Sequence, residues 1–102
     1  MRYEWNEAKN RLNQRKHGVS FEVAALVFED DRCLVGLDRI DETGEQRWHA
    51  IGAAQAESEC IMVLVVVHTY SENHDGEEII RIISARKAQK RDIRRYQEQA
   101  MD

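Results

Sequence analysis

The stretch from Glu59 to Tyr70, which reads ECIMVLVVVHTY, decides the fold that we expect for this chain. Its centre, Ile61 to Val67, is continuously apolar and rich in β-branched residues, as is typical of a central strand covered on both faces. Three more stretches have strand-like composition, with turn-rich segments between them: Arg32 to Asp38, Gln46 to Ala53 and Glu78 to Arg86. Four consecutive strands with short connections predict an antiparallel meander.

Helix signals lie on both sides of these strands. Asn6 can cap a helix from about Glu7 to Lys16 that Gly18 would end, and Ser20 can cap a second helix. The apolar positions that the helices would bury are Ala8 and Leu12 in the first, Phe21, Ala24, Ala25 and Phe28 in the second, and Ile93, Tyr96 and Ala100 in a last helix from Lys87 to Gln99. With a short strand at Tyr3 to Trp5, the pattern predicts an α+β fold with two N-terminal helices and one C-terminal helix.

Length and composition indicate a small protein with one core. The chain has 102 residues, of which 42% are hydrophobic and 7% aromatic, so we expect a single domain over residues 1–102. The longest apolar run, Ile61 to Val67, is far shorter than the roughly 20 residues that cross a bilayer, and no signal peptide is recognisable. We therefore expect a cytoplasmic protein without a membrane partner.

The two cysteines and the histidines show no metal-type spacing. Cys33 and Cys60 stand in apolar sequence, so a reduced pair of buried small hydrophobic residues is the favoured interpretation, with a disulfide as the alternative. His68 and His74 are six positions apart, which fits no standard zinc site. We predict neither a metal nor a cofactor.

The charge is distributed unevenly along the chain. The net charge of −4 argues against a generic nucleic-acid binder, but it divides into +3 for residues 1–18, −11 for residues 19–80, +6 for residues 81–95 and −2 for residues 96–102. The basic charge is therefore concentrated near the two ends, and an anionic ligand would have to bind there.

Cutting RNA without a metal requires a base for the ribose 2′-OH, fixed positive charge near the phosphate, and an acid for the leaving oxygen. Arg47 and His49 share one face of a predicted strand, because residues two apart point the same way. Strict alternation puts Arg81 and Arg86 on opposite faces of the last strand. Both could serve one site only if a bulge or a strand end turned one of them.

Each of these cations also has a structural interpretation. Lys16 and His17 are explained as favourable charges at the end of a helix beside Gly18. Arg47 could form an exposed ion pair with the acidic loop at residues 41–45, and the basic helix at residues 87–95 could simply be a solvated face. Arg81 lies between two isoleucines and needs a partner or a ligand.

Several short segments together resemble the BrnT family of type II toxins. They are Trp5-Asn6-Glu7-Ala8-Lys9, Lys16-His17-Gly18-Val19-Ser20-Phe21-Glu22, Val27-Phe28-Glu29-Asp30, Arg81-Ile82-Ile83-Ser84-Ala85-Arg86 and Arg94-Arg95-Tyr96. The resemblance implies a RelE-like fold, a ribonuclease activity that blocks translation, and a BrnA-type antitoxin. The antitoxin would bind the toxin in a hetero-oligomer and would alone connect it to operator DNA.

The resemblance also implies site residues. Basic and aromatic side chains above a sheet face would cut RNA, and the residues available for catalysis are Arg81, Arg86, Arg47, His17, Lys16 and Tyr96. Substrate binding would fall to Lys9, Lys87, Lys90, Arg91 and Arg94. We assign Arg81 and Arg86 to the phosphate, with Arg47 as the next choice. His17 is the expected general base or acid, because arginine stays protonated.

Two hypotheses follow: a ribonuclease toxin acting on RNA, or a non-catalytic module whose basic ends bind a protein or a nucleic acid. The first requires the folded chain to gather Arg81, Arg86 and Arg47 into one pocket. Finding these arginines scattered, each neutralised by a neighbouring carboxylate, would remove the physical basis of the first hypothesis.

Overall fold

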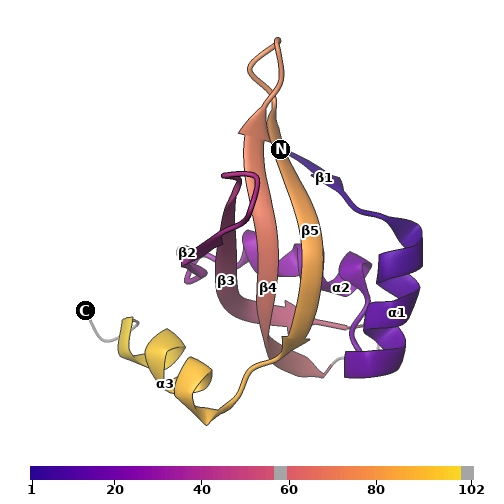
Figure 1. Ribbon diagram of the computed structural model, residues 1–102. Helices are drawn as coiled ribbons and strands as arrows, with labels where there is room; N and C mark the ends of the chain where they lie inside the picture. The colour runs from indigo at the N-terminus through magenta and orange to yellow at the C-terminus, as the bar shows by residue number, and fades with distance from the viewer. Residues whose placement is uncertain (57–59, 100–102) are drawn as a thin grey trace.

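The computed structural model describes residues 1–56 and 60–99, which form a five-stranded sheet, three α-helices and one 3-10 helix (Figure 1). The elements in chain order are β1 (Arg2–Glu4), α1 (Glu7–His17), α2 (Phe21–Ala25), η1 (Leu26–Glu29), β2 (Leu34–Ile40), β3 (Gln46–Gln55), β4 (Ile61–Glu72), β5 (Glu78–Lys87) and α3 (Lys90–Gln99). The four strands expected in the middle of the chain are confirmed. Of the residues named above, Glu59 and Ala100 lie outside the described part of the chain.

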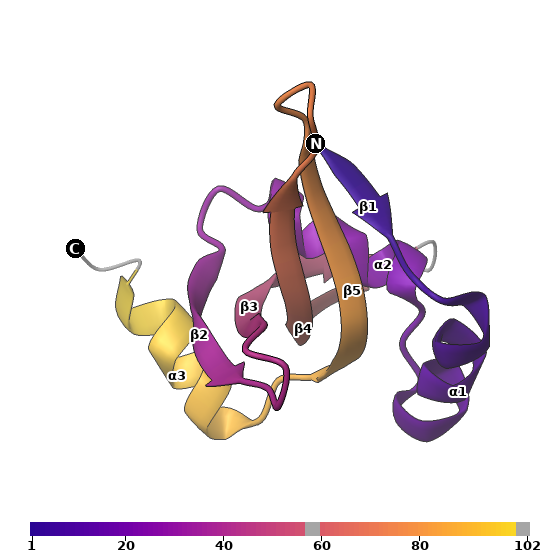
Figure 2. The same ribbon diagram turned by 45° about the horizontal axis from the view of Figure 1, so that its top comes forward.

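The sheet has the order β1-β5-β4-β3-β2. Strands β2 to β5 form the expected antiparallel meander, because each pairs with the next along the chain. β1 runs parallel to β5, with Tyr3 opposite Ile80, so the sheet is mixed and not wholly antiparallel. A parallel pair needs a long connection, which all the intervening elements provide here. Figure 2 shows β1 and β2 at opposite edges of the sheet.

One face of the sheet packs against α2 and η1, and we call it the back face. The core lies there and contains Val19, Phe21, Ala24, Val27, Ala50, Ala54, Leu64, Val66, Ile80, Ile82 and Ala85. Gly52 of β3 permits a close approach of η1, since a Cβ at this position would lie 2.8 Å from Val27 Cγ1. The opposite face of the sheet, which we call the front face, lies on the side of α3.

The inner side of α1 is polar, contrary to the expectation from the sequence. Ala8 and Leu12 are exposed, whereas Asn10 and Asn13 are buried. Asn13 accepts a hydrogen bond from Ala85 N–H (3.1 Å) and donates to Ala85 C=O (2.8 Å). The Asn13 amide thus provides hydrogen-bond partners for backbone groups of β5 that lie beyond the end of β1. Hydrogen bonds, and not apolar contacts, therefore attach α1 to the sheet.

A bulge in β5 changes which side chains share a face. Ile82 pairs with His68 and Ser84 with Val67, so Ile83 is an extra residue in β5. The uninterrupted alternation expected for this strand is therefore wrong beyond Ile82. Arg81, Ser84 and Arg86 lie opposite Thr69, Val67 and Val65, which share one face of β4, and all three thus belong to the front face.

Local signals at the helix ends are confirmed. Asn6 and Ser20 accept hydrogen bonds from Lys9 N–H and Val23 N–H, and Gly18 ends α1 with φ of 71°. α3 begins three residues later than expected, because β5 continues to Lys87.

The cysteines only partly match their prediction. Cys33 and Cys60 are both free, but Cys60 is exposed and not buried. Burial raises the pKa of the Cys33 thiol to about 11. Within residues 1–56 and 60–99, no helix is long and apolar enough to cross a membrane.

Candidate active site

The front face carries polar and cationic side chains in rows across the strands. Gly36, His49, Val67 and Ser84 pair in one row, and Ile51, Val65 and Arg86 pair in the next. Arg47 lies two residues before His49 on β3 and therefore on the same face. Arg81 of β5 also belongs to this face. The front face thus gathers three arginines and a histidine that are distant in the sequence.

α3 crosses the front face, and hydrogen bonds to Asp92 attach the beginning of this helix to β5. The Asp92 carboxylate accepts hydrogen bonds from Gln89 N–H and from Arg86 Nη1, both at 2.9 Å, and its side chain is 7% exposed. Desolvation acts to raise the pKa of Asp92, but the Gln89 amide and the Arg86 guanidinium outweigh it and lower the pKa. One carboxylate therefore caps the helix and joins it to β5.

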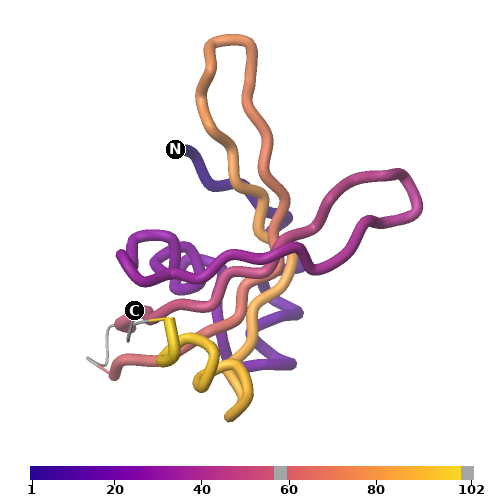
Figure 3. Tube along the Cα trace, turned by 90° about the vertical axis from the view of Figure 1, so that its left-hand side faces the viewer, coloured from indigo at the N-terminus to yellow at the C-terminus, as the bar shows by residue number. Residues whose placement is uncertain are grey.

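A second polar anchor lies further along α3. Tyr96 O–H donates a 2.5 Å hydrogen bond to Asp30, which also accepts from Ala53 N–H at 2.8 Å. Desolvation and the bond to Asp30 raise the pKa of Tyr96 to about 12. Gln99 adds a hydrogen bond to Arg32 C=O near the end of the helix. Figure 3 shows α3 lying away from the tips of both long hairpins.

A cavity of about 210 Å³ lies between α3 and the front face, and we call it the α3 cavity. Its lining consists of an apolar floor, two carboxylates, a histidine and three arginines: Ile51, Val65, Val67, Asp38, Asp92, His49, Arg86, Arg91 and Arg95. Among the described residues, neither Arg91 nor Arg95 forms an ion pair with a carboxylate. The cavity is therefore suited to an anionic group.

His49 has a defined orientation in this cavity. Its Nδ1 lies 3.6 Å from Asp38 Oδ1, and its Nε2 is buried without a hydrogen-bond partner in the described chain. Gly36 leaves room for the ring, because a Cβ there would lie 3.0 Å from His49 Nε2. A bulge between Leu37 and Arg39 accommodates Asp38 as an extra residue of β2.

The three arginines chosen from the sequence share the front face but not one cavity. Only Arg86 lines the α3 cavity, while Arg47 and Arg81 lie toward the β2–β3 hairpin. Arg81 Nη2 lies 2.7 Å from Glu45 Oε1, and Arg47 Nε lies 3.5 Å from Asp41 Oδ2. The ion pair expected for Arg47 is confirmed, but it is half-buried and not exposed, and the single pocket containing all three arginines is not found.

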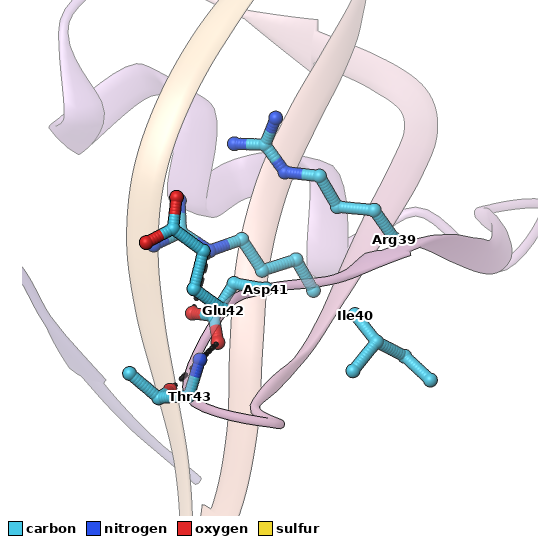
Figure 4. A pocket seen from close by; sticks show the side chains of 6 residues that line it. Arg39, Ile40, Asp41, Glu42 and Thr43 are labelled. Atoms are coloured by element: carbon cyan, nitrogen blue, oxygen red, sulfur yellow. Dashed lines mark hydrogen bonds and ion pairs between the residues drawn. The ribbon is translucent and has the colours of Figure 1, made fainter.

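The hairpin end has its own pocket, of about 440 Å³, lined in part by Arg39 and Arg47. Figure 4 shows the side chains of Arg39 and Ile40 leaving β2 in opposite directions, with Asp41 and Thr43 joined by hydrogen bonds at the turn. Arg39 and Arg47 pair across the two strands, which places two cations side by side. The nearby carboxylates of Asp41 and Glu42 reduce the positive potential there.

The remaining residues predicted from the sequence are divided among other places. Lys9, Lys16 and His17 line a separate pocket at the edge of β5 that also includes Ile83 and Ser84. Tyr96 faces Asp30 and does not line the α3 cavity. Arg91 does line it, whereas Lys87, Lys90 and Arg94 are exposed outside it.

Four polar or charged residues of the cavity were not chosen from the sequence as site residues, namely Asp38, His49, Asp92 and Arg95. The shared strand face of Arg47 and His49 was a signal that could have identified His49. No sequence signal identifies Arg95, because the rotation of α3 relative to the sheet depends on tertiary contacts. In the described part of the chain, no group of three or more His, Cys, Asp or Glu side chains could hold a metal ion.

The arrangement in the α3 cavity can do acid–base chemistry beside an anion. Histidine is the side chain that most readily exchanges a proton near neutral pH, and a carboxylate at Nδ1 orients the ring. Arginines above it can bind phosphate oxygens and stabilise negative charge as it develops.

Comparison with known families gives one match that covers most of the chain. The family model described as "Ribonuclease toxin, BrnT, of type II toxin-antitoxin system" matches residues 5–92. The matched range includes β2 to β5 and therefore the whole sheet floor of the α3 cavity. Among curated proteins, no match is found.

Proposed function

This chain belongs to the BrnT family of ribonuclease toxins of type II toxin-antitoxin systems, and from that premise we propose that it cleaves RNA in the α3 cavity without a metal ion. The observation that carries the proposal is that His49, whose Nε2 has no hydrogen-bond partner in the described chain, lines one cavity together with Arg86, Arg91 and Arg95. A base and several fixed cations are the groups that metal-independent cleavage requires.

In the proposed step, the His49 imidazole removes the proton of a ribose 2′-OH. The 2′-oxygen then bonds to the adjacent phosphorus while the bond to the 5′-oxygen breaks, which leaves a 2′,3′-cyclic phosphate. The departing 5′-oxygen takes a proton from water. Arg86, Arg91 and Arg95 bind the phosphate oxygens, and their charge stabilises the phosphorane, since its negative charge exceeds that of the substrate.

The residues predicted from the sequence receive revised roles in this proposal. Arg47 and Arg81 would contact RNA at the hairpin end of the front face. Phosphate oxygens can most easily replace the Glu45 partner of Arg81, because exposed ion pairs contribute little. Lys87, Lys90 and Arg94 would contact RNA outside the cavity. Asp38 would orient His49, which replaces His17 as the proposed base.

The wider biology is also proposed from the family. The chain would act as one toxin domain with a RelE-like fold in the cytoplasm, and RNA cleavage would block translation. A BrnA-type antitoxin would neutralise it and would carry the complex to operator DNA. The sheet, with helices on the back face and cations on the front, supports the fold assignment.

The test is incubation of the purified chain with RNA in the presence of a chelator, followed by end-group analysis. Cleavage should yield a 2′,3′-cyclic phosphate, and His49→Gln or Arg86→Ala should lower the rate by about 10² to 10³-fold. His17→Gln is the matched control and should retain activity, because His17 lies in the pocket at the edge of β5. An inactive His17→Gln beside a fully active His49→Gln would move the site to that pocket.

A second function is supported by a specific observation. Arg47, Arg81 and Arg86 each have a carboxylate partner, as expected of a module that binds without catalysis. Such a module would bind RNA or an acidic protein in a salt-sensitive way and would leave the RNA intact with or without divalent ions.

A further inference from the structure

The side of β2 opposite the α3 cavity is apolar and exposed. Val35, Leu37 and Ile40 pair with Ala50, Trp48 and Gln46, which places all three on the back face. The bulge at Asp38 matters here, because without the extra residue Ile40 would point to the front. Their exposed fractions are 51%, 47% and 58%, so α2 and η1 do not cover this part of the sheet.

Val35 lines a groove of about 410 Å³, which we call the back groove, and Leu37 and Ile40 lie on the same face of β2 outside its lining. Its walls are formed mainly by apolar and aromatic side chains of the back face and η1, namely Phe28, Val35, Trp48, His68, Tyr70 and Ile80. The His68 ring contacts Phe28 edge to face at 4.8 Å, and desolvation lowers the pKa of His68. The lowered pKa favours the neutral form of this ring.

The rim of the back groove is acidic. Glu72 and Glu78 lie directly opposite each other on β4 and β5, and Tyr70 O–H donates a 3.3 Å hydrogen bond to Glu72. Two like charges in a cross-strand pair destabilise a hairpin unless a cation lies between them. Within the described chain, neither glutamate forms an ion pair.

The neighbouring edge of the sheet is also open. β2 is the terminal strand, and no described element pairs with its outer edge. An edge strand with exposed apolar side chains is prone to aggregation unless another chain covers it. A second copy of this chain fits poorly, because a symmetric contact would place the two acidic rims together.

We propose that the back groove is the docking site for the antitoxin, through a segment that alternates apolar side chains with lysine or arginine. The apolar side chains enter the groove, the cations lie between Glu72 and Glu78, and the backbone lies beside the free edge of β2. The proposal rests on the family assignment, since a type II toxin has an antitoxin partner. It places this contact and the α3 cavity on opposite faces of the sheet.

The test measures binding of the purified cognate antitoxin to wild type and to Val35→Glu and Leu37→Glu, by titration calorimetry. Both variants should bind at least about 30-fold more weakly, as for anchor residues of an interface. Leu12→Glu and Ile61→Glu are matched controls, because these residues are exposed and apolar but distant from the groove, and they should bind as wild type does. Glu72→Gln, which keeps the shape of the rim, should also weaken binding and make it less sensitive to salt.

Three results would overturn the proposal: unchanged binding by Val35→Glu, equal losses in the control variants, or a wild-type dimer that Val35→Glu dissociates. Measuring RNA cleavage with the same samples distinguishes a failure of the docking proposal from a failure of the nuclease proposal. Val35→Glu should cleave RNA at the wild-type rate, which also shows that the variant is folded. If the wild type cleaves no RNA, the nuclease proposal fails, while the binding result and a thermal unfolding curve still decide the docking site.

Discussion

At the scale of the residue, Gly36 leaves room for the His49 side chain on the neighbouring strand. Its own backbone conformation does not require glycine. A methyl group at this position would lie 3.0 Å from His49 Nε2, which is closer than carbon normally approaches nitrogen. The imidazole would have to move by a few tenths of an ångström, while the sheet itself would be unaffected. A glycine in the middle of a strand thus has a role in the proposed site.

We predict that Gly36→Ala lowers the rate of RNA cleavage by about 10- to 100-fold, because small misplacements of a catalytic group are costly. The free energy of unfolding should change by less than about 1 kcal/mol, as denaturant titration can measure. Adding Gly36→Ala to His49→Gln should cause no further loss, since both changes act through the same ring. Additive losses would show that Gly36 acts elsewhere.

At the scale of the element, α1 is unusual because asparagines form its buried side. The Asn13 amide bonds with Ala85 N–H, Ala85 C=O and Val19 C=O, and Asn10 accepts a hydrogen bond from Phe21 N–H. The two bonds to Ala85 replace the backbone hydrogen bonds that a longer β1 would form with β5. The helix therefore completes the edge of the sheet.

Asn13→Ala should lower the free energy of unfolding by about 2 to 4 kcal/mol, because it leaves buried backbone groups of β5 without partners. Leu12→Ala is the control on the same helix, and it should change stability by less than about 0.5 kcal/mol, since Leu12 is 59% exposed. Urea denaturation measures both values. A larger effect at Leu12 than at Asn13 would contradict this account of how α1 is attached.

At the scale of the whole molecule, α3 is held over the sheet mainly by carboxylates, so its attachment should depend on pH. The pKa of both Asp30 and Asp92 is lowered from the ordinary value of 3.8, because the hydrogen bonds that each receives outweigh desolvation. A carboxyl group with a lowered pKa stabilises the folded state above its ordinary pKa, and this contribution disappears as the pH falls through the folded pKa.

We therefore predict that the thermal midpoint of the wild type falls as the pH is lowered from about 4 to 2. Asp92→Asn should unfold at a lower temperature than the wild type at pH 7, and its midpoint should decline less steeply in acid. Thermal unfolding followed by circular dichroism between pH 2 and 7 measures both slopes. Parallel curves for the two proteins would show that Asp92 does not contribute to the acid sensitivity.

Much of the local structure could be predicted from the sequence. Strand-like composition located β2 to β5, the caps at Asn6, Gly18 and Ser20 were recognisable, and the cations at both ends of the chain pointed to an anionic ligand. The short segments from Trp5 to Arg86 were sufficient to indicate the family. These features depend on neighbouring residues, whose backbone preferences and hydrogen bonds are largely local.

Only the tertiary structure decided which cations share a cavity. The bulge at Ile83 puts Arg81 and Arg86 on one face, and the docking of α3 brings Arg95 close to His49. The Glu45 partner of Arg81 likewise comes from a turn that is distant in the sequence. A shift of one residue in strand register reverses every side chain after it, and the position of α3 depends on contacts from Asp30 and Asp92. No local pattern encodes such long-range contacts.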